Sequence, residues 1–200
     1  RFEPIYGVGW LKEEYDMLNV DFTVRGKMFE EYIQIMQTLW TQENPEFDGQ
    51  FVSFKDAKFA PKPVQPNGVP VWFGGDAQAV LKRVGRYANG WSPFQTPPEK
   101  FPEAMQLIKS QPEYDGRDIG IFFALEMLNV GAHHEIKGDD RSKGAWDANK
   151  IIDQCHWLNE LGVTETIVPI PPIDGFDAYK ERLAWVAEEI MPKVAHLTPK

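Results

Sequence analysis

Short apolar segments alternate with longer amphipathic segments along this chain of 200 residues. Residues 69–73, for example, are apolar, end at Gly74 and Gly75, and are followed by helical periodicity as far as Tyr87. The same order occurs at residues 5–44, 89–108, 119–161 and 166–190. Two parallel strands need a crossover connection, which a helix supplies. The pattern therefore predicts an α/β fold built from five parallel strand–helix pairs.

Proline, glycine and aspartate mark the expected boundaries of several elements. The first helix starts at Val24 and ends before Pro45, and the turn signal at Asp48 predicts a hairpin within residues 46–60. A rigid proline-rich connector follows over residues 61–70. Asp76 is the expected N-cap of the next helix. The last helix is expected to end at Pro192, with these side chains facing inward: Tyr179, Leu183, Val186 and Ile190.

Two architectures fit this pattern. An open doubly wound sheet can be complete with five strands and would bind a nucleotide. A closed (β/α)₈ barrel needs three more strand–helix units, which would precede Arg1. The pattern by itself does not choose between them. In both architectures, ligands bind at the carboxyl ends of the parallel strands.

Composition argues against several classes of protein. The 30 acidic residues outnumber the 21 basic ones, and a net charge of -9 without a basic run argues against a nucleic-acid partner. No segment approaches the roughly 18 consecutive apolar residues of a membrane span, and we expect no signal peptide. The lone Cys155 cannot form an internal disulfide, which fits a reducing, cytoplasmic location. Its helical position predicts a buried structural thiol.

Five glycines fall at the expected carboxyl ends of strands: Gly7, Gly9, Gly74, Gly75 and Gly90. Glycine permits positive φ and a close approach of the backbone to a ligand. A helix that begins after Gly75 also presents free N–H groups and a positive dipole end, which suit a phosphate. Tight turns alone would equally explain these glycines. The dinucleotide fingerprint is not matched, because its third glycine is missing after Gly9.

Other polar clusters have structural explanations. Arg25 with Glu30 and Glu31 is expected to form solvated or structural ion pairs on an amphipathic helix. Residues 133–140 contain histidines and acids without a compact zinc spacing, so we predict no metal site and consider this loop a candidate lid over the substrate.

The tryptophans at the strands, Trp72 and Trp91, either stack on a ring system or belong to the core.

Seven motifs carry a resemblance to a known family. They are Gly7-Val8-Gly9-Trp10, Glu13-Glu14-Tyr15, Arg25-Gly26 with Glu30-Glu31 and Leu39-Trp40, Gly49-Gln50-Phe51, Pro61-Lys62-Pro63-Val64-Gln65, Pro70-Val71-Trp72-Phe73-Gly74-Gly75 and Asn89-Gly90-Trp91-Ser92-Pro93. In order and spacing they resemble the central segment of the bacterial luciferase-like flavin and deazaflavin oxidoreductases. The resemblance is good over residues 1–110 and extends to the remainder in general pattern.

The resemblance implies a partial TIM (β/α)₈ barrel, with strands four to eight, their helices and an inserted hairpin. Residues 1–200 would form a single luciferase-like domain whose first three βα units are absent. The implied activity is that of an oxidoreductase or monooxygenase that uses reduced FMN or the deazaflavin F420 on a small organic substrate. Relatives commonly form homodimers. A non-catalytic flavin-binding barrel is the alternative on the same fold.

The resemblance also implies where the cofactor binds. Gly74 and Gly75 would form its phosphate-binding turn, beside Asp76, and the segment Gly7-Val8-Gly9-Trp10 would line the mouth of the barrel near the ring. Relatives often carry Ser or Thr in place of Asp76, and a carboxylate beside a phosphate is expected to repel it unless it turns away to cap the helix. Asn19 stands where Gly is usual, and asparagine tolerates a left-handed backbone. No catalytic residue is named, because much of that constellation in relatives comes from the first three strands.

Overall fold

The computed structural model describes residues 2–125, 147–168 and 174–198. Its main sheet has four short parallel strands in the order β1-β4-β5-β6. They are β1 (Ile5–Tyr6), β4 (Trp72–Gly74), β5 (Gly90–Ser92) and β6 (Gly120–Ile121). A parallel bridge between Phe122 and Glu165 extends the sheet beyond β6. Neighbouring strands therefore follow one another in the order in which they occur along the chain.

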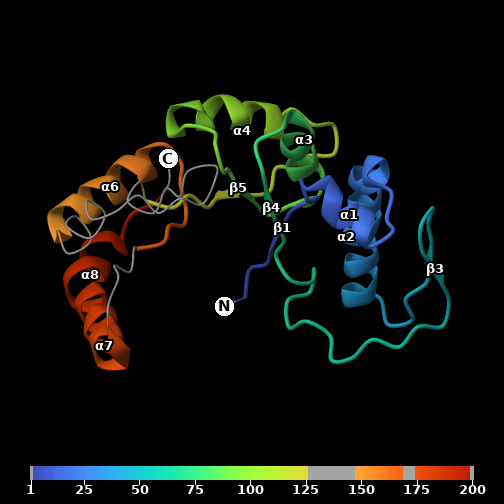
Figure 1. The fold of residues 1–200 in the computed structure, drawn as a ribbon, viewed down its shortest axis with the longest axis horizontal. Helices are drawn as coiled ribbons and strands as arrows, with labels where there is room; N and C mark the ends of the chain where they lie inside the picture. The colour runs from blue at the N-terminus through green and yellow to red at the C-terminus, as the bar shows by residue number, and fades with distance from the viewer. Residues whose placement is uncertain (1, 126–146, 169–173, 199–200) are drawn as a thin grey trace.

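This strand order bears on the two architectures that the sequence allows. An open doubly wound sheet reverses its strand order at a switch point and carries helices on both faces. Within the described residues the order does not reverse, and the helices fan around one side of the strands (Figure 1). The chain therefore adopts an α/β fold with a parallel sheet, and the part of it that the structure describes does not have doubly wound topology.

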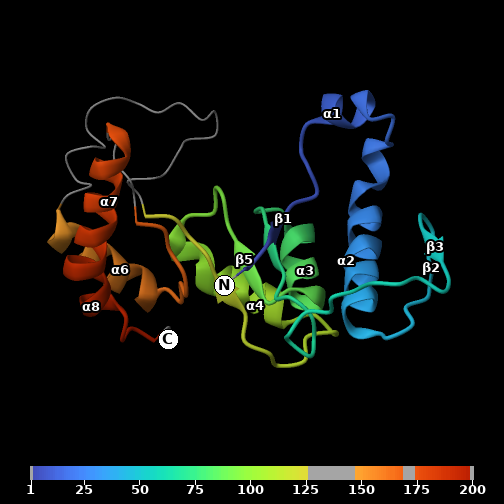
Figure 2. The same ribbon diagram turned by 90° about the horizontal axis from the view of Figure 1, so that it is seen from below.

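The predicted helices and hairpin are confirmed. The crossover helices are α2 (Arg25–Thr41), α3 (Gln78–Tyr87), α4 (Phe101–Lys109) and α6 (Ala148–Glu160). The strands β2 (Phe47–Asp48) and β3 (Ser53–Phe54) form the antiparallel hairpin, which lies beyond α2 at the end of the molecule (Figure 2). The short helix α1 (Lys12–Met17) follows β1 and has no counterpart in the prediction. None of the described helices combines the length and apolar character that a bilayer-spanning helix needs.

The sheet packs its helix-facing side into a continuous aromatic and aliphatic core. Phe73, Trp91 and Ile121 are register partners on adjacent strands and are at most 2% exposed. Phe29 of α2 contacts Phe73 edge to face with ring centroids 4.9 Å apart, and Phe101 of α4 contacts Trp91 in the same way at 5.5 Å. Each fully buried side chain of this size contributes about 2 kcal/mol or more of transfer free energy, so these contacts hold the helices on the sheet. Cys155 is also buried in this core, as predicted.

The opposite face of the sheet is filled by the indole of Trp72. Its register partner is Gly90, which in turn pairs with Gly120. A Cβ atom added to Gly90 would lie 2.1 Å from Trp72 Cε3, and one added to Gly120 would lie 2.4 Å from its Cη2. Both glycines therefore make room for the indole. Gly90 is the first residue of β5, so its expected place at a carboxyl strand end was wrong.

The C-terminal region departs from the prediction in three ways. Helix α7 (Gly175–Trp185) continues through a π-helical segment (Val186–Ile190) into α8 (Met191–Val194). Pro192 therefore does not end the helix, because it lies in the first turn of α8, where a missing N–H is tolerated. Of the side chains expected to face inward, Tyr179 is 37% and Leu183 is 48% exposed, whereas Ile190 is 1% exposed. A strand was expected over residues 166–170. The structure has a single parallel bridge just before this range, between Glu165 and Phe122, and residues 169–173 lie outside the described structure.

Charged residues of α2 tie the hairpin and α3 to this helix. Glu30 pairs with Arg83 of α3 at 2.7 Å. The Glu31 carboxylate accepts hydrogen bonds from three consecutive backbone N–H groups of the hairpin turn, at 2.7–2.8 Å for the shortest bond to each. Arg25 does not pair with either glutamate in the described structure; its Nη1 donates to the Phe22 carbonyl at 2.8 Å. The expected ion pair therefore exists on Glu30, but with a partner from another helix.

We expect Glu31→Ala to destabilise the fold by about 2 kcal/mol, because three partly buried N–H groups of the hairpin turn lose a charged acceptor. Urea unfolding measures the change, and amide exchange at residues 50–52 should accelerate more than elsewhere. The neighbouring Glu30→Gln is the matched control, since a partly exposed ion pair contributes about 1 kcal/mol or less. Equal losses in the two variants would show that the hairpin does not depend on the Glu31 carboxylate.

Candidate functional site

The carboxyl ends of the parallel strands open onto one edge of the sheet. Figure 2 shows the turns that follow β1, β4 and β5 on the upper side, whereas the connections that lead into β4 and β6 lie on the lower side. Gly74 ends β4 and Ser92 ends β5, and the two residues are register partners. Gly7 directly follows β1. Ser92 belongs to a recognised motif, but the sequence analysis did not single it out as a site residue.

The turn after β1 is held by a tyrosine from α1. The hydroxyl of Tyr15 donates a hydrogen bond to the carbonyl of Val8. Gly9 has φ of 75°, and a Cβ atom at this position would lie 2.8 Å from the Tyr15 ring. Gly9 is therefore required both for its backbone conformation and for the close approach of the tyrosine. Trp10 extends from this turn and is 83% exposed, and a Cβ atom on Gly7 would meet no described atom within 4 Å.

The turn between β4 and α3 depends on Gly75. This residue has φ of 126°, a conformation that only glycine adopts readily. Its N–H donates to the Ser92 carbonyl at 3.0 Å, and its carbonyl accepts from Trp91 Nε1 at 2.8 Å. Because the polar backbone groups of Gly75 are used within the sheet, the free donors at this turn are the N–H groups in the first turn of α3. Those residues, Ala77, Gln78 and Ala79, are exposed.

Asp76 does not cap α3. The N-cap is Ala77, which makes no side-chain capping bond. The Asp76 carboxylate instead accepts hydrogen bonds from the backbone of Phe94, Gln95 and Thr96, in the loop after β5. The prediction of an N-cap was wrong because a distant loop supplies better-placed donors than the helix that follows. The carboxylate therefore does not turn toward the helix as expected, and its hydrogen bonds go to the loop after β5.

The two tryptophans at the strands belong to the core. Trp91 is fully buried on the helix-facing side, and Trp72 is 5% exposed on the opposite side. The exposed aromatic side chains at the carboxyl edge are instead Trp10 and, at 52% exposure, Phe94. Phe94 was missed because its sequence neighbourhood marks only a loop before a proline-started helix. Asn19, in the segment after α1, has φ of 54°, which confirms the left-handed backbone expected there.

Glu165 is an ionisable residue that sequence reasoning missed. Its main-chain bridge to Phe122 places it at the far end of the strand order from β1. Burial, a hydrogen bond with Glu3 and the charge of Glu3 raise the pKa of the Glu165 carboxyl from 4.5 to about 7. Glu3 lies two residues before β1, so the two carboxyl groups come from opposite ends of the sheet. No local sequence signal indicates this contact.

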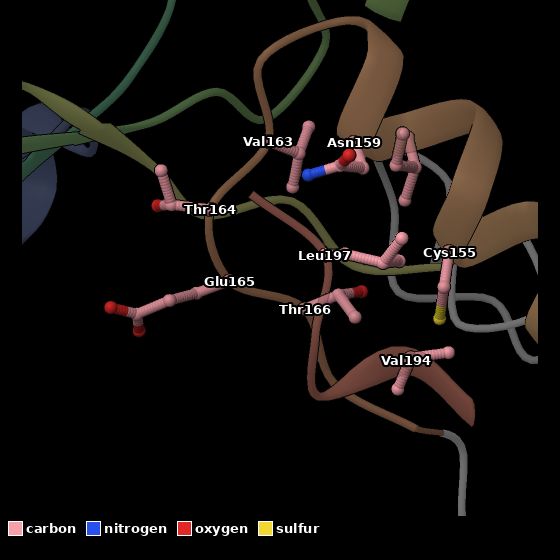
Figure 3. Close-up of a pocket in the computed structure, with 9 residues that line it drawn as sticks. Cys155, Asn159, Val163, Thr164, Glu165, Thr166, Val194 and Leu197 are labelled. Carbon is pink, nitrogen blue, oxygen red and sulfur yellow. The ribbon is translucent and has the colours of Figure 1, made fainter. Parts of the chain in front are cut away.

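A cavity of about 140 Å³ lies between α6, residues 163–166 and α8. Cys155, Thr166 and Leu197 contribute to its walls, whereas the side chain of Glu165 points away from Cys155 and Leu197 (Figure 3). Burial raises the pKa of the Cys155 thiol, which keeps it protonated near neutral pH. The cavity belongs to the helix layer and does not include the glycine turns after β1 and β4.

The remaining predicted features lie outside the described structure. Residues 133–140, considered as a polar loop and candidate lid, fall within the undescribed segment 126–146. The described residues contain no group of three His, Cys, Asp or Glu side chains placed to hold a metal ion.

Comparison with known protein families gives one match that spans most of the chain. Residues 1–189 match the model of the luciferase-like monooxygenases. The chain belongs to this family. The recognition of the family from its motifs is therefore confirmed.

Relatives in this family are longer than the chain. A Mycobacterium tuberculosis protein (strain ATCC 25618 / H37Rv) is 34% identical over 189 residues, which cover 91% of this chain and 58% of that protein. Pyrimidine monooxygenase RutA of Klebsiella pneumoniae (strain 342) is 25% identical over 178 residues, which cover 83% of this chain and 47% of RutA. The chain thus spans about half the length of the curated relatives it matches.

Solved structures of similar fold include a monooxygenase and a reductase that depends on coenzyme F420. Monooxygenase RslO1 from Streptomyces bottropensis superposes with a TM-score of 0.71 at 14% identity, over 95% of this chain and 68% of that chain. The coenzyme F420-dependent tetrahydromethanopterin reductase from Methanopyrus kandleri superposes with a TM-score of 0.62 at 16% identity, over 95% of this chain and 73% of that chain. At these identities the likeness shows the fold alone, which is an α/β fold similar to that of luciferase-like TIM barrels.

We expect Gly75→Ala to destabilise the protein by about 2 kcal/mol, because alanine is strained at this positive φ and its Cβ would lie 3.3 Å from Val80. The adjacent Gly74→Ala is the matched control, since φ is not positive there and the nearest described atom would lie at an ordinary 3.4 Å. Thermal unfolding of both variants measures the difference. An equal loss at both positions would argue against a conformational requirement at Gly75.

We expect the Glu165→Gln variant to be more stable than the wild type at pH 8 by about 1 kcal/mol. This is less than the full difference between the folded and unfolded pKa values implies, because the Glu165 carboxyl is partly exposed to solvent. The folded-state pKa of about 7 exceeds the unfolded value, so the stability linked to the protonated carboxyl is complete below pH 4.5. It is lost as the pH rises through about 7. Urea unfolding at pH 4.5 and pH 8 measures the difference, with the exposed Glu43→Gln as control. A pH-independent effect of Glu165→Gln would contradict the raised pKa.

Proposed function

We propose that the protein is an oxidoreductase or monooxygenase that uses reduced FMN or F420 on a small organic substrate. The observation that carries the proposal is the start of α3 beside Gly74 and Gly75, where the first backbone N–H groups have no side-chain cap. This turn lies at the carboxyl edge of a parallel sheet in a luciferase-like chain. RslO1 is a monooxygenase and the Methanopyrus kandleri enzyme depends on F420, which supports this class of chemistry. Separate fluorescence titrations of the full-length protein with FMN and with F420 distinguish the two cofactors.

We further propose that residues 1–200 form one domain that supplies strands four to eight of a (β/α)₈ barrel. The unreversed strand order and the helices on one side support this assignment. So does the contact between Glu3 and Glu165. Strands in a flat sheet are about 4.8 Å apart, so segments four positions apart would be about 19 Å from each other. Two glutamate side chains would not meet across that distance unless the sheet curls.

The residues at the strand ends fit a phosphate-bearing cofactor. The residues that carry the first-turn N–H groups of α3 are exposed, and the positive end of the helix dipole favours an anion. Gly7 presents no side chain at the opening and has no described atom within 4 Å of its Cβ position, which leaves room for a flat ring, and Trp10 is exposed three residues further on. The bound cofactor supplies the reducing equivalents. The role proposed for this chain is to hold the phosphate through backbone N–H groups and to line the ring pocket with the turn from Gly7 to Trp10.

A small-molecule substrate, a homodimeric assembly and a cytoplasmic location complete the proposal. Light scattering of the purified full-length protein tests the dimer. Turnover of reduced cofactor by the same protein separates an enzyme from a non-catalytic flavin-binding barrel. A protein that binds the reduced cofactor but never oxidises it in the presence of oxygen or a range of carbonyl substrates, and never reduces the oxidised cofactor with alcohols, would contradict the enzymatic assignment.

We expect the full-length protein to bind FMN or F420 saturably in a fluorescence titration, and Gln78→Pro to weaken that binding about tenfold. Gln78 is the first residue of α3, where proline is tolerated and removes only the N–H group. Gln78→Ala, which keeps the N–H group, is the control and should bind as the wild type does. Unchanged affinity in Gln78→Pro, with unchanged thermal stability, would contradict the assignment of the phosphate to this turn.

A further inference from the structure

Three consecutive backbone N–H groups converge on the Asp76 carboxylate. The N–H groups of Phe94 and Gln95 donate to Oδ1 at 3.0 Å, and that of Thr96 donates at 2.8 Å. The Thr96 hydroxyl adds a fourth bond to the same oxygen at 2.6 Å, and Gln95 also reaches Oδ2 at 3.0 Å. Successive N–H groups that point to one centre form an anion-binding concavity. Here the anion is a side chain of the protein itself.

The carboxylate joins two segments that are 18 to 20 residues apart in the sequence. Asp76 lies between the end of β4 and the start of α3. Thr96 immediately precedes Pro97, the N-cap of the 3₁₀ turn that leads into α4. One half-buried side chain therefore sets the position of the loop after β5 against the first turn of α3. The two loops are connected a second time, by the bond from the Gly75 N–H to the Ser92 carbonyl.

This arrangement resolves the electrostatic difficulty of an aspartate beside a phosphate. Both carboxylate oxygens accept hydrogen bonds from the loop after β5, so the negative charge is stabilised by N–H groups that do not belong to α3. The hydrogen bonds to the Asp76 carboxylate come from Phe94, Gln95 and Thr96, and none comes from the first-turn N–H groups of α3. They remain available to a second anion.

We propose that Asp76 is a positioning residue for the cofactor phosphate: it binds the loop of Phe94, Gln95 and Thr96 and so fixes one wall of the phosphate site, without contacting the phosphate. This inference rests on the proposed function. It replaces the expectation that Asp76 is itself a cofactor ligand. It also assigns a role to the loop after β5, which no sequence motif indicated.

The test compares cofactors with and without the phosphate. We expect Asp76→Ala to lower the affinity for FMN about tenfold relative to riboflavin, because the loosened loop no longer shapes the phosphate site while the ring contacts persist. If the wild-type protein binds F420 instead, the matched pair is F420 and its deazaflavin riboside without the phosphate tail. Asp76→Asn retains one acceptor oxygen and should lose less than Asp76→Ala. A purely structural role would lower thermal stability without changing this affinity ratio.

Two further variants keep the test informative if Asp76→Ala does not fold. Thr96→Val removes one of the bonds to the carboxylate and should lower the same ratio by a smaller factor, whereas Thr96→Ser should restore it. Asp115→Asn is the control, because Asp115 accepts bonds from Arg117 in an exposed turn before β6. An unchanged ratio in Asp76→Ala, or a higher affinity for FMN, would overturn the inference. Failure of the wild type to bind either cofactor would instead overturn the proposed function.

Discussion

Parallel pairing in unreversed order is the constraint on which the rest of this structure depends. Because each strand of the main sheet lies beside the next strand of that sheet along the chain, every crossover must leave from one edge and return to the other. This brings the turns after β1, β4 and β5 together, although more than 60 residues separate the first turn from the second. It also places the helices on one side of the sheet. The interaction of Glu3 with Glu165 supports the proposal that the sheet is also curved.

Residues of one type serve different purposes according to their place on the strands. Gly75 and Gly9 provide backbone conformations that other residues avoid, whereas Gly90 and Gly120 provide space for the indole of Trp72. All four occur in short apolar contexts of similar appearance. The difference lies in register, because the first pair follows strand ends and the second pair lies opposite a large side chain on a neighbouring strand. A glycine beside a strand is therefore evidence for a binding turn only when its register is known.

The sequence was sufficient for the features that depend on local signals. Periodicity located the crossover helices, Asp48 marked the hairpin, and the ordered motifs identified the family. Features that depend on distant partners were missed: the loop bound by Asp76, the pairing of Glu30 with Arg83, and the raised pKa of Glu165. Pro192 was misread for a related reason, since a π-helical segment before it changes which N–H groups need partners. In the first three cases the deciding neighbour comes from another part of the chain, and for Pro192 it is the irregular helix geometry just before it.

An acidic protein that binds an anionic cofactor needs short-range attraction. A net charge of -9 opposes the approach of a phosphate, but salt screens such charges beyond about 8 Å at physiological ionic strength. Contacts within that distance therefore decide the affinity. Backbone N–H groups at a helix start supply them without adding a basic side chain, provided that no unsatisfied carboxylate competes for the same donors. The loop after β5 meets this condition by binding Asp76, so the anionic side chain and the proposed phosphate site can be neighbours.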